Sequence, residues 1–105
     1  MTSNPTGPVT AGVDHNYFKR ITVDVTDFEP NNPQVLLRFK SSRLHINLIN
    51  EGGSLVEYSF NGNAVHGDLA TSGLTQERNF IGRQYTKIWF KSGGSSTVRV
   101  EIWGE

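Results

Sequence analysis

The chain has 105 residues, with ten Lys and Arg balanced by ten Asp and Glu, and it contains no cysteine. This length gives room for one domain with a single hydrophobic core. A formal net charge of zero excludes a whole-chain field that would attract nucleic acid or an anionic membrane. The absence of cysteine excludes disulfides, thiol catalysis and thiolate metal sites.

The first fifteen residues, MTSNPTGPVTAGVDH, are rich in Pro, Gly, Ser, Thr and Asn. Such a composition buries too little apolar surface to offset the entropy lost on ordering. The segment has neither the basic start nor the apolar run of a signal peptide or a membrane anchor. We therefore expect a flexible arm over residues 1–15 and a folded domain over residues 16–105.

Beyond the arm, short runs of Val, Ile, Leu, Phe, Thr and Tyr alternate with polar residues and are separated by Gly, Asn and Pro. No segment keeps the apolar spacing of a helix, and period-two alternation is typical of strands with one buried face. We expect an all-β chain, an antiparallel β-sandwich for which jelly-roll connections are one option. The side chains expected to face the core in the first four strands are Ile21, Val23 and Val25, then Val35, Leu37 and Phe39, then Leu44, Ile46 and Leu48, then Val56, Tyr58 and Phe60.

Two turns within this pattern predict β-hairpins. Residues 51–53 (EGG) fit a three-residue loop, which would set Leu48 against Val56 across the two strands. Residues 61–62 (Asn-Gly) fit a two-residue type I′ turn, because both residue types accept a positive φ. The strand returning from that turn would be AVHGDL, residues 64–69.

The C-terminal segment predicts a third hairpin, which turns at SGGSS, residues 92–96. One face of this hairpin would carry apolar pairs, and the other would pair Trp89 with Arg99 and Tyr85 with Trp103. Aromatic and arginine side chains are the usual anchors of binding interfaces. We therefore predict that these four residues form an interface for protein or sugar, unless a second sheet or the arm covers them.

Histidines and carboxylates in the middle of the chain are the candidates for a metal site or a general base: His45, Glu57, His66 and Asp68. Metal sites in cupin-like barrels begin with closely spaced histidines such as His-x-His, and the sequence has no such pair. The serines lie in predicted turns and no G-x-S-x-G motif occurs, so nothing supports a nucleophilic triad. We expect a protein without enzymatic activity, cofactor or metal.

The segments EYSFNGNAVHGDL and KIWFKSGGSSTVRVEIWG together resemble small virion structural proteins of tailed bacteriophages. In that family a hairpin of the pattern YSFDG…VHG precedes an end of the pattern IWF(K/R)…VxVxxW. The resemblance covers residues 56–104, and Asn61 stands where the family pattern has Asp, a change that the turn tolerates.

This resemblance implies a non-enzymatic capsid decoration or cement protein, located in the virion after assembly in the cytoplasm of a host bacterium. Its partners would be further copies of itself, most simply a trimer, and the major capsid protein or another virion protein, with no nucleic acid or membrane partner. Two other classes stay open on the residues alone: a carbohydrate-binding module or phage tail adhesin, and a cupin-like metalloenzyme. Glycan binding would favour the first of these and stoichiometric metal the second.

Overall fold

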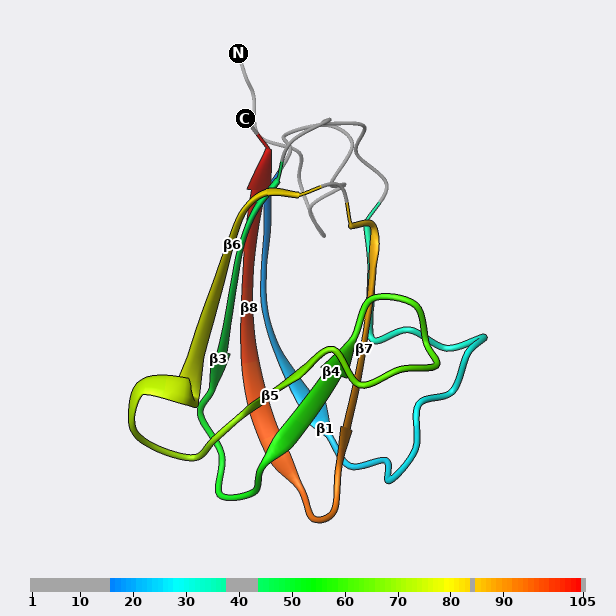
Figure 1. Cartoon of the computed structure of the whole chain (residues 1–105), viewed down its shortest axis with the longest axis vertical. Helices are drawn as coiled ribbons and strands as arrows, with labels where there is room; N and C mark the ends of the chain where they lie inside the picture. The colour runs from blue at the N-terminus through cyan, green and yellow to red at the C-terminus, as the bar shows by residue number, and fades with distance from the viewer. Residues whose placement is uncertain (1–15, 38–43, 84, 105) are drawn as a thin grey trace.

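A computed structural model describes residues 16–37, 44–83 and 85–104 of the chain. Two four-stranded antiparallel sheets pack against each other, which confirms the predicted all-β sandwich (Figure 1). The predicted arm, residues 1–15, lies outside the described residues, as does Phe39. Sheet A has the order β1-β8-β3-β6 and consists of β1 (Asn16–Val23), β8 (Ser96–Gly104), β3 (Leu44–Asn50) and β6 (Glu77–Arg83). Sheet B has the order β2-β7-β4-β5 and consists of β2 (Val35–Leu36), β7 (Lys87–Ser92), β4 (Val56–Ser59) and β5 (Gly67–Leu69).

The chain is folded as one long two-stranded ribbon. Strand β1 pairs with β8, β2 with β7, β3 with β6 and β4 with β5, all antiparallel. The closed end of the ribbon is the connection between β4 and β5. Further pairing of β3 with β8 and of β4 with β7 winds the ribbon into the two sheets. As a result, β4 and β5 are the only consecutive described strands that lie side by side in one sheet.

Two of the three predicted hairpins are therefore wrong. The segment 51–53 connects β3 in sheet A to β4 in sheet B, and Leu48 pairs with Arg78 and Val100 rather than with Val56. The segment 92–96 likewise leads from β7 in sheet B to β8 in sheet A. Apolar alternation determines which face of a strand meets the core, but it does not determine the neighbouring strand. Two strands that face each other across the core satisfy the same pattern as two strands paired in one sheet.

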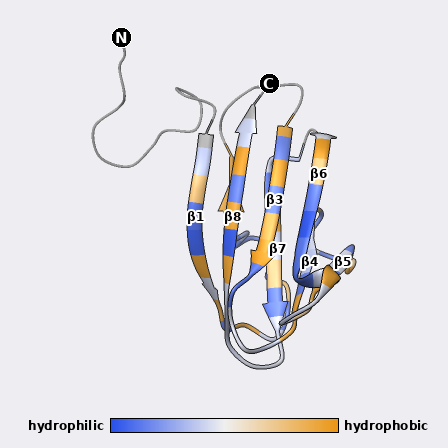
Figure 2. Ribbon diagram, turned by 90° about the vertical axis from the view of Figure 1, so that its left-hand side faces the viewer, coloured by the Kyte–Doolittle hydropathy of each residue, from blue (hydrophilic) through white to orange (hydrophobic). Residues whose placement is uncertain are grey.

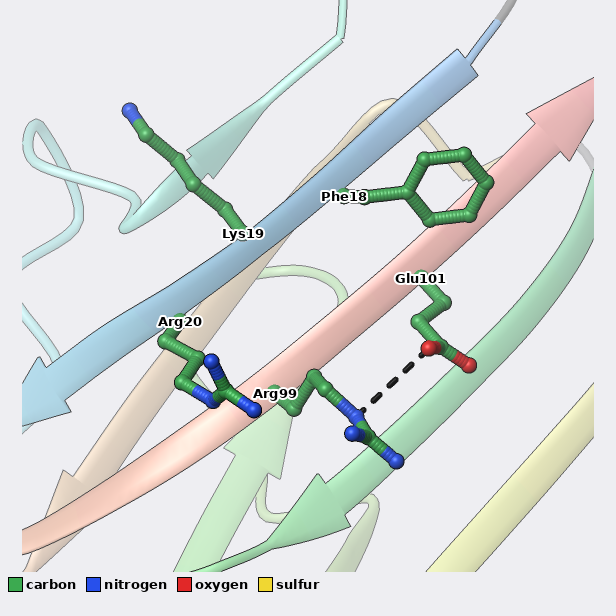
Figure 3. Close-up of a pocket in the computed structure, with 5 residues that line it drawn as sticks. All are labelled: Phe18, Lys19, Arg20, Arg99 and Glu101. Carbon is green, nitrogen blue, oxygen red and sulfur yellow. Dashed lines mark ion pairs between the residues drawn. The ribbon is translucent and has the colours of Figure 1, made fainter.

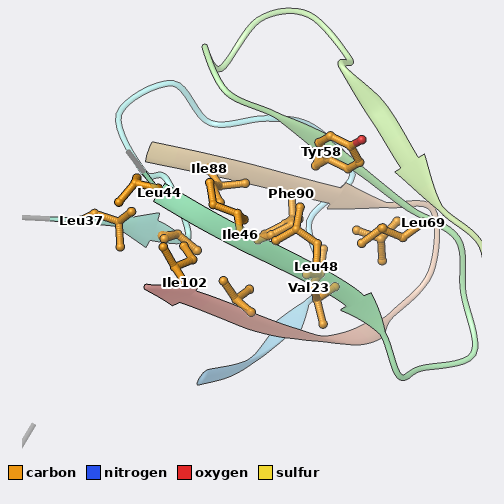
Figure 4. Close-up of a cluster of buried hydrophobic side chains, with 14 residues drawn as sticks. Val23, Leu37, Leu44, Ile46, Leu48, Tyr58, Leu69, Ile88, Phe90 and Ile102 are labelled. Atoms are coloured by element: carbon orange, nitrogen blue, oxygen red, sulfur yellow. The ribbon is translucent and has the colours of Figure 1, made fainter. Parts of the chain in front are cut away.

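The inward-facing residues were mostly predicted correctly, since they form the core between the sheets (Figure 4). Ile21 and Phe60 are partly buried against this core, and Val25 lies beyond the end of β1. Strand β6 was not predicted, because in its sequence ERNFIGR only Phe80 packs against the core. The buried core side chains are Val23, Val35, Leu37, Leu44, Ile46, Leu48, Val56, Tyr58, Leu69, Ile88, Phe90, Val98, Val100 and Ile102.

A buried polar group joins the two sheets at the end where the chain crosses between them. Asn50 is 0% exposed, and its side-chain Nδ2 donates hydrogen bonds to the carbonyls of Ser54 at 2.8 Å and Leu69 at 3.0 Å. Its Oδ1 accepts from the Ser96 hydroxyl at 2.6 Å and from the Gly52 N–H at 3.0 Å. Both N–H donors and both acceptor positions of the Asn50 side-chain amide are therefore hydrogen-bonded, and these bonds compensate for the cost of burying it.

Candidate functional site

Trp89, one of the four predicted interface residues, is covered by its own chain. It lies on the outer side of sheet B, yet it is only 5% exposed. Its indole N–H donates to the Glu29 carbonyl at 2.9 Å, and a Cβ placed on Gly62 would lie 3.0 Å from the ring. The connections 24–34 and 60–66 supply this cover (Figure 1). The side chain therefore offers little contact surface, and the described residues that cover it belong to these connections and not to a second sheet.

Tyr85 belongs to a separate aromatic stack beside the β4–β5 connection. Its ring stacks on Phe60 with centroids 3.8 Å apart and an interplanar angle of 8°. His66 stacks on Phe60 as well, at 5.7 Å, and its Nδ1 accepts a hydrogen bond from the Phe60 N–H at 2.9 Å. The predicted pairing of Tyr85 with Trp103 is absent, because Tyr85 precedes β7 of sheet B, whereas Trp103 lies within β8 of sheet A.

The connection between β4 and β5 is longer than the predicted type I′ turn. Tyr58 pairs with Gly67, so residues 60–66 form the loop and Glu57 lies opposite Asp68 rather than His66. Inside the loop, Oδ1 of Asn61 accepts hydrogen bonds from the two N–H groups of residues 63 and 64, at 2.8 and 3.0 Å. An asparagine side chain that caps its own backbone in this way competes with a tight two-residue turn.

Arg99 and Trp103 do share a surface, the outer face of sheet A, which Figure 2 views directly. Trp103 pairs with His45 on β3 and its ring stacks on the imidazole, with centroids 4.2 Å apart. Phe18 on β1 lies 6.2 Å from Trp103 on the other side, and Ile81 on β6 pairs with His45. Phe18 and Ile81 are 59% and 66% exposed. These four residues, Phe18, Trp103, His45 and Ile81, form an aromatic strip that crosses all strands of sheet A.

A charged row lies beside the aromatic strip on the same face. Arg20 and Arg99 stand opposite each other on β1 and β8, and Glu51 bridges them through ion pairs of 2.8 and 3.4 Å. Arg99 also pairs with Glu101 at 3.5 Å. The hydrogen bond from Arg20 holds the pKa of the Glu51 carboxyl below its ordinary value. The bridge relieves a like-charge cross-strand pair that would otherwise be unfavourable.

Between the strip and the charged row lies a shallow hollow of about 180 Å³ (Figure 3). Its walls are the Phe18 ring, the two guanidinium groups and Glu101, while Lys19 extends from the opposite side of β1. Phe18 and Arg20 were not among the predicted interface residues. The signal was available, because an inward Ile21 on the same strand implies that its even-numbered neighbours point outward.

The candidate metal and base residues are not brought together. Among the residues that the structure describes, no group of three or more His, Cys, Asp or Glu side chains is placed to hold a metal ion. His45 lies on sheet A, whereas Glu57 and Asp68 lie on sheet B, paired with Lys91 and Arg78 at 4.0 Å each. No helix in the described part of the chain is long and apolar enough to span a membrane.

The outer face of sheet A is therefore the best candidate site. It combines exposed aromatic and aliphatic side chains with guanidinium, carboxylate and amide groups on a rigid sheet, which suits adhesion more than bond chemistry. When the chain is compared with protein-family models, with curated proteins and with solved structures, it matches none of them.

Proposed function

We propose that this chain is a non-enzymatic virion structural protein, a capsid decoration or cement component that stabilises the shell through contacts with copies of itself and with a capsid protein. The observation that carries this proposal is the aromatic strip on the outer face of sheet A. Phe18 and Ile81, two large apolar side chains, remain 59% and 66% exposed at its two ends. Contiguous apolar surface of this kind marks a protein interaction site.

The composition of the face supports a protein partner. Interface centres are enriched in aromatic side chains and arginine and are surrounded by polar groups. On sheet A the strip supplies the aromatic groups, and Arg20, Arg99 and Glu101 supply the polar surroundings. The interface set is accordingly revised: Arg99 and Trp103 stay, Phe18, His45 and Ile81 join them, and Trp89 and Tyr85 leave it.

The strand order gives independent support. A two-stranded ribbon wound into sheets of order β1-β8-β3-β6 and β2-β7-β4-β5 is how we expect a jelly roll to be built. Jelly rolls occur among viral capsid proteins and lectins. The likeness of residues 56–104 to phage virion proteins points to the first of these groups.

Capsid binding tests the proposal. Particles of the parent phage assembled without this chain would be mixed with purified protein, sedimented, and tested for bound protein and for resistance to heat. Wild type and a Lys87→Glu control, altered on sheet B, should bind and raise the disruption temperature. A Phe18→Ser, Ile81→Ser variant should bind at least about tenfold more weakly, because it loses the exposed apolar contacts. Wild-type particles that contain no copy of the chain would refute the proposal.

A carbohydrate-binding role is the second candidate, favoured by one feature of the same face. Trp103 adjoins Glu101 and Asn47, and the buried Oδ1 of Asn47 has no hydrogen-bond partner among the described residues. An aromatic ring beside an amide and a carboxylate, here hydrogen-bonded to each other at 3.4 Å, suits a sugar. Selective binding on a glycan array that is lost in Trp103→Ala, with no binding to particles, would favour this role over the first.

A further inference from the structure

We infer that the outer face of sheet A packs against the same face of a second copy, about a two-fold axis that runs parallel to the strands between β8 and β3. This inference rests on the proposed function, since it specifies how the proposed contact face is used. Such an axis places β1 opposite β6 of the second copy, and β8 opposite β3 of the second copy. Strand directions stay aligned, as they do when two sheets pack face to face.

The charged row is complementary to itself under this symmetry. Across the four strands it reads Arg20, Arg99, Ile49 and Glu77, so two guanidinium groups, which already pair with Glu51 and Glu101, lie toward the β1 edge and the Glu77 carboxylate lies at the β6 edge. The axis brings Arg20 over Glu77 of the second copy, and the same contact recurs in the reverse direction. Glu77 is exposed and forms no ion pair with any residue that the structure describes. The hollow beside Arg20 and Arg99 offers its carboxylate two guanidinium groups.

The central pairs of two further rows are complementary as well. Glu101 meets the side-chain amide of Asn47 of the second copy, which pairs a carboxylate acceptor with an N–H donor. Trp103 meets His45 of the second copy, so these two rings are buried against their counterparts, while Phe18 lies over Asn79 of the second copy. A two-fold axis across the strands would instead set the strip over the row of Thr22, Thr97 and Glu51, where it finds no apolar partner.

The size of the face indicates a reversible association. Four strands spaced about 4.8 Å apart and seven residues long cover roughly 19 Å by 23 Å. Two such faces amount to roughly 870 Å², which is below the ~1,200 Å² of stable specific interfaces and in the range of weak, transient ones. The two-fold pair should therefore form at high local concentration, as on a shell, and dissociate on dilution. It differs from the trimer expected from the sequence.

Charge-swapped variants test the inference by sedimentation velocity over a wide concentration range. Glu77→Arg alone and Arg20→Glu alone should each weaken self-association by roughly tenfold or more, because each sets like charges together at both symmetric contacts. An equimolar mixture of the two variants restores opposite charges at both contacts, so it should form a mixed dimer about as tight as wild type. Lys87→Glu should associate like wild type.

If the mixture associates again, both variants must be folded, because unfolded chains cannot form this dimer. The result therefore separates a loss of association from a loss of stability. The inference is overturned if wild type stays monomeric at the highest concentration, if it forms a trimer that Glu77→Arg does not weaken, or if the mixture fails to associate. The proposed function is judged separately by particle binding. If wild type and the mixture of Glu77→Arg with Arg20→Glu dimerise but do not bind particles, the capsid role alone is refuted. If the protein stays monomeric and binds particles, this inference alone is refuted.

Discussion

Replacing Asn50 by alanine should destabilise the fold strongly, because the amide satisfies four polar groups from three parts of the chain. Two of these, the Leu69 carbonyl and the Ser96 hydroxyl, form fully buried hydrogen bonds with it. The Ser54 carbonyl and the Gly52 N–H are only partly buried, so water replaces the lost amide at lower cost. Each buried group left without a partner costs about 1–3 kcal/mol.

The expected loss for Asn50→Ala is therefore about 3–5 kcal/mol of unfolding free energy, out of a total of about 5–15 kcal/mol for a domain. The melting temperature should fall by roughly 12 °C or more. Urea titration monitored by tryptophan fluorescence measures the change, since Trp89 is buried in the folded chain. Asn50→Asp tests the same idea without loss of volume. One of the aspartate oxygens would face the two carbonyls to which Nδ2 donates in wild type. This variant should therefore lose at least as much unfolding free energy as Asn50→Ala.

Asn47→Ala is the matched control, taken from the same strand but from the side that points away from the core. The Asn47 side chain makes a single hydrogen bond with the described residues, at 3.4 Å to Glu101. Its removal should change the free energy of unfolding by no more than about 0.5 kcal/mol. The reasoning would be refuted if Asn50→Ala also stayed within about 1 kcal/mol of wild type, because the buried hydrogen bonds would then contribute no more than a hydrogen bond at the protein surface.

Three further outcomes are expected. Trp89→Ala should lower the unfolding free energy in urea titration by about 3–5 kcal/mol. Trp89→Phe, which loses mainly the indole N–H hydrogen bond, should lower it by about 1–2 kcal/mol. Equal stability of wild type and both variants would contradict the burial of Trp89. Gly52→Ala should lower the unfolding free energy by about 1–3 kcal/mol, because the new Cβ would collide with Ser96 and with the Thr97 N at 2.5 Å. Gly53→Ala, whose Cβ would meet nothing within 4 Å, should stay within about 0.5 kcal/mol of wild type. The lowered pKa of Glu51 means that its ion pairs stabilise the fold above the ordinary value of 4.5 and lose this effect as the pH falls through the lowered folded value. The difference in melting temperature between wild type and Glu51→Gln should therefore be present at neutral pH and vanish in strong acid; a difference that grew with acid would contradict the sign.

The burial pattern of the strands could be predicted from the sequence, and their neighbours could not. Leu44, Ile46 and Leu48 alternate with polar residues and are 2%, 0% and 0% exposed, as expected for one buried face. The same alternation made EGG and SGGSS resemble hairpin turns, although both segments cross between sheets. Residues eight positions apart, such as Leu48 and Val56, can both face one core from two sheets as easily as they can pair in a ladder. A local register test cannot distinguish the two arrangements.

The candidate site was predictable only in part, for the same reason. Trp103 and Arg99 lie on a strand whose outward side is evident from Val98, Val100 and Ile102. The strip itself needs β1, β3 and β6 beside β8, and this order depends on pairings between distant parts of the chain. Trp89 was misjudged because exposure was inferred from its side of the sheet. Two connections cover that side, and sequence alternation carries no information about where a connection packs.

Glu51 links the topology of the fold to the behaviour proposed for its surface. The residue directly follows β3, and its N–H donates to the Thr97 carbonyl at 2.7 Å, which extends the pairing with β8 by one step before the chain crosses to sheet B. This extension holds its carboxylate between Arg20 and Arg99. A carboxylate from a second copy would share guanidinium groups that already have an ion-pair partner, so it gains less than it would from bare arginines. The same contact that stabilises two neighbouring arginines in one copy would therefore weaken the proposed pairing of two copies, which fits a component proposed to associate only at high local concentration.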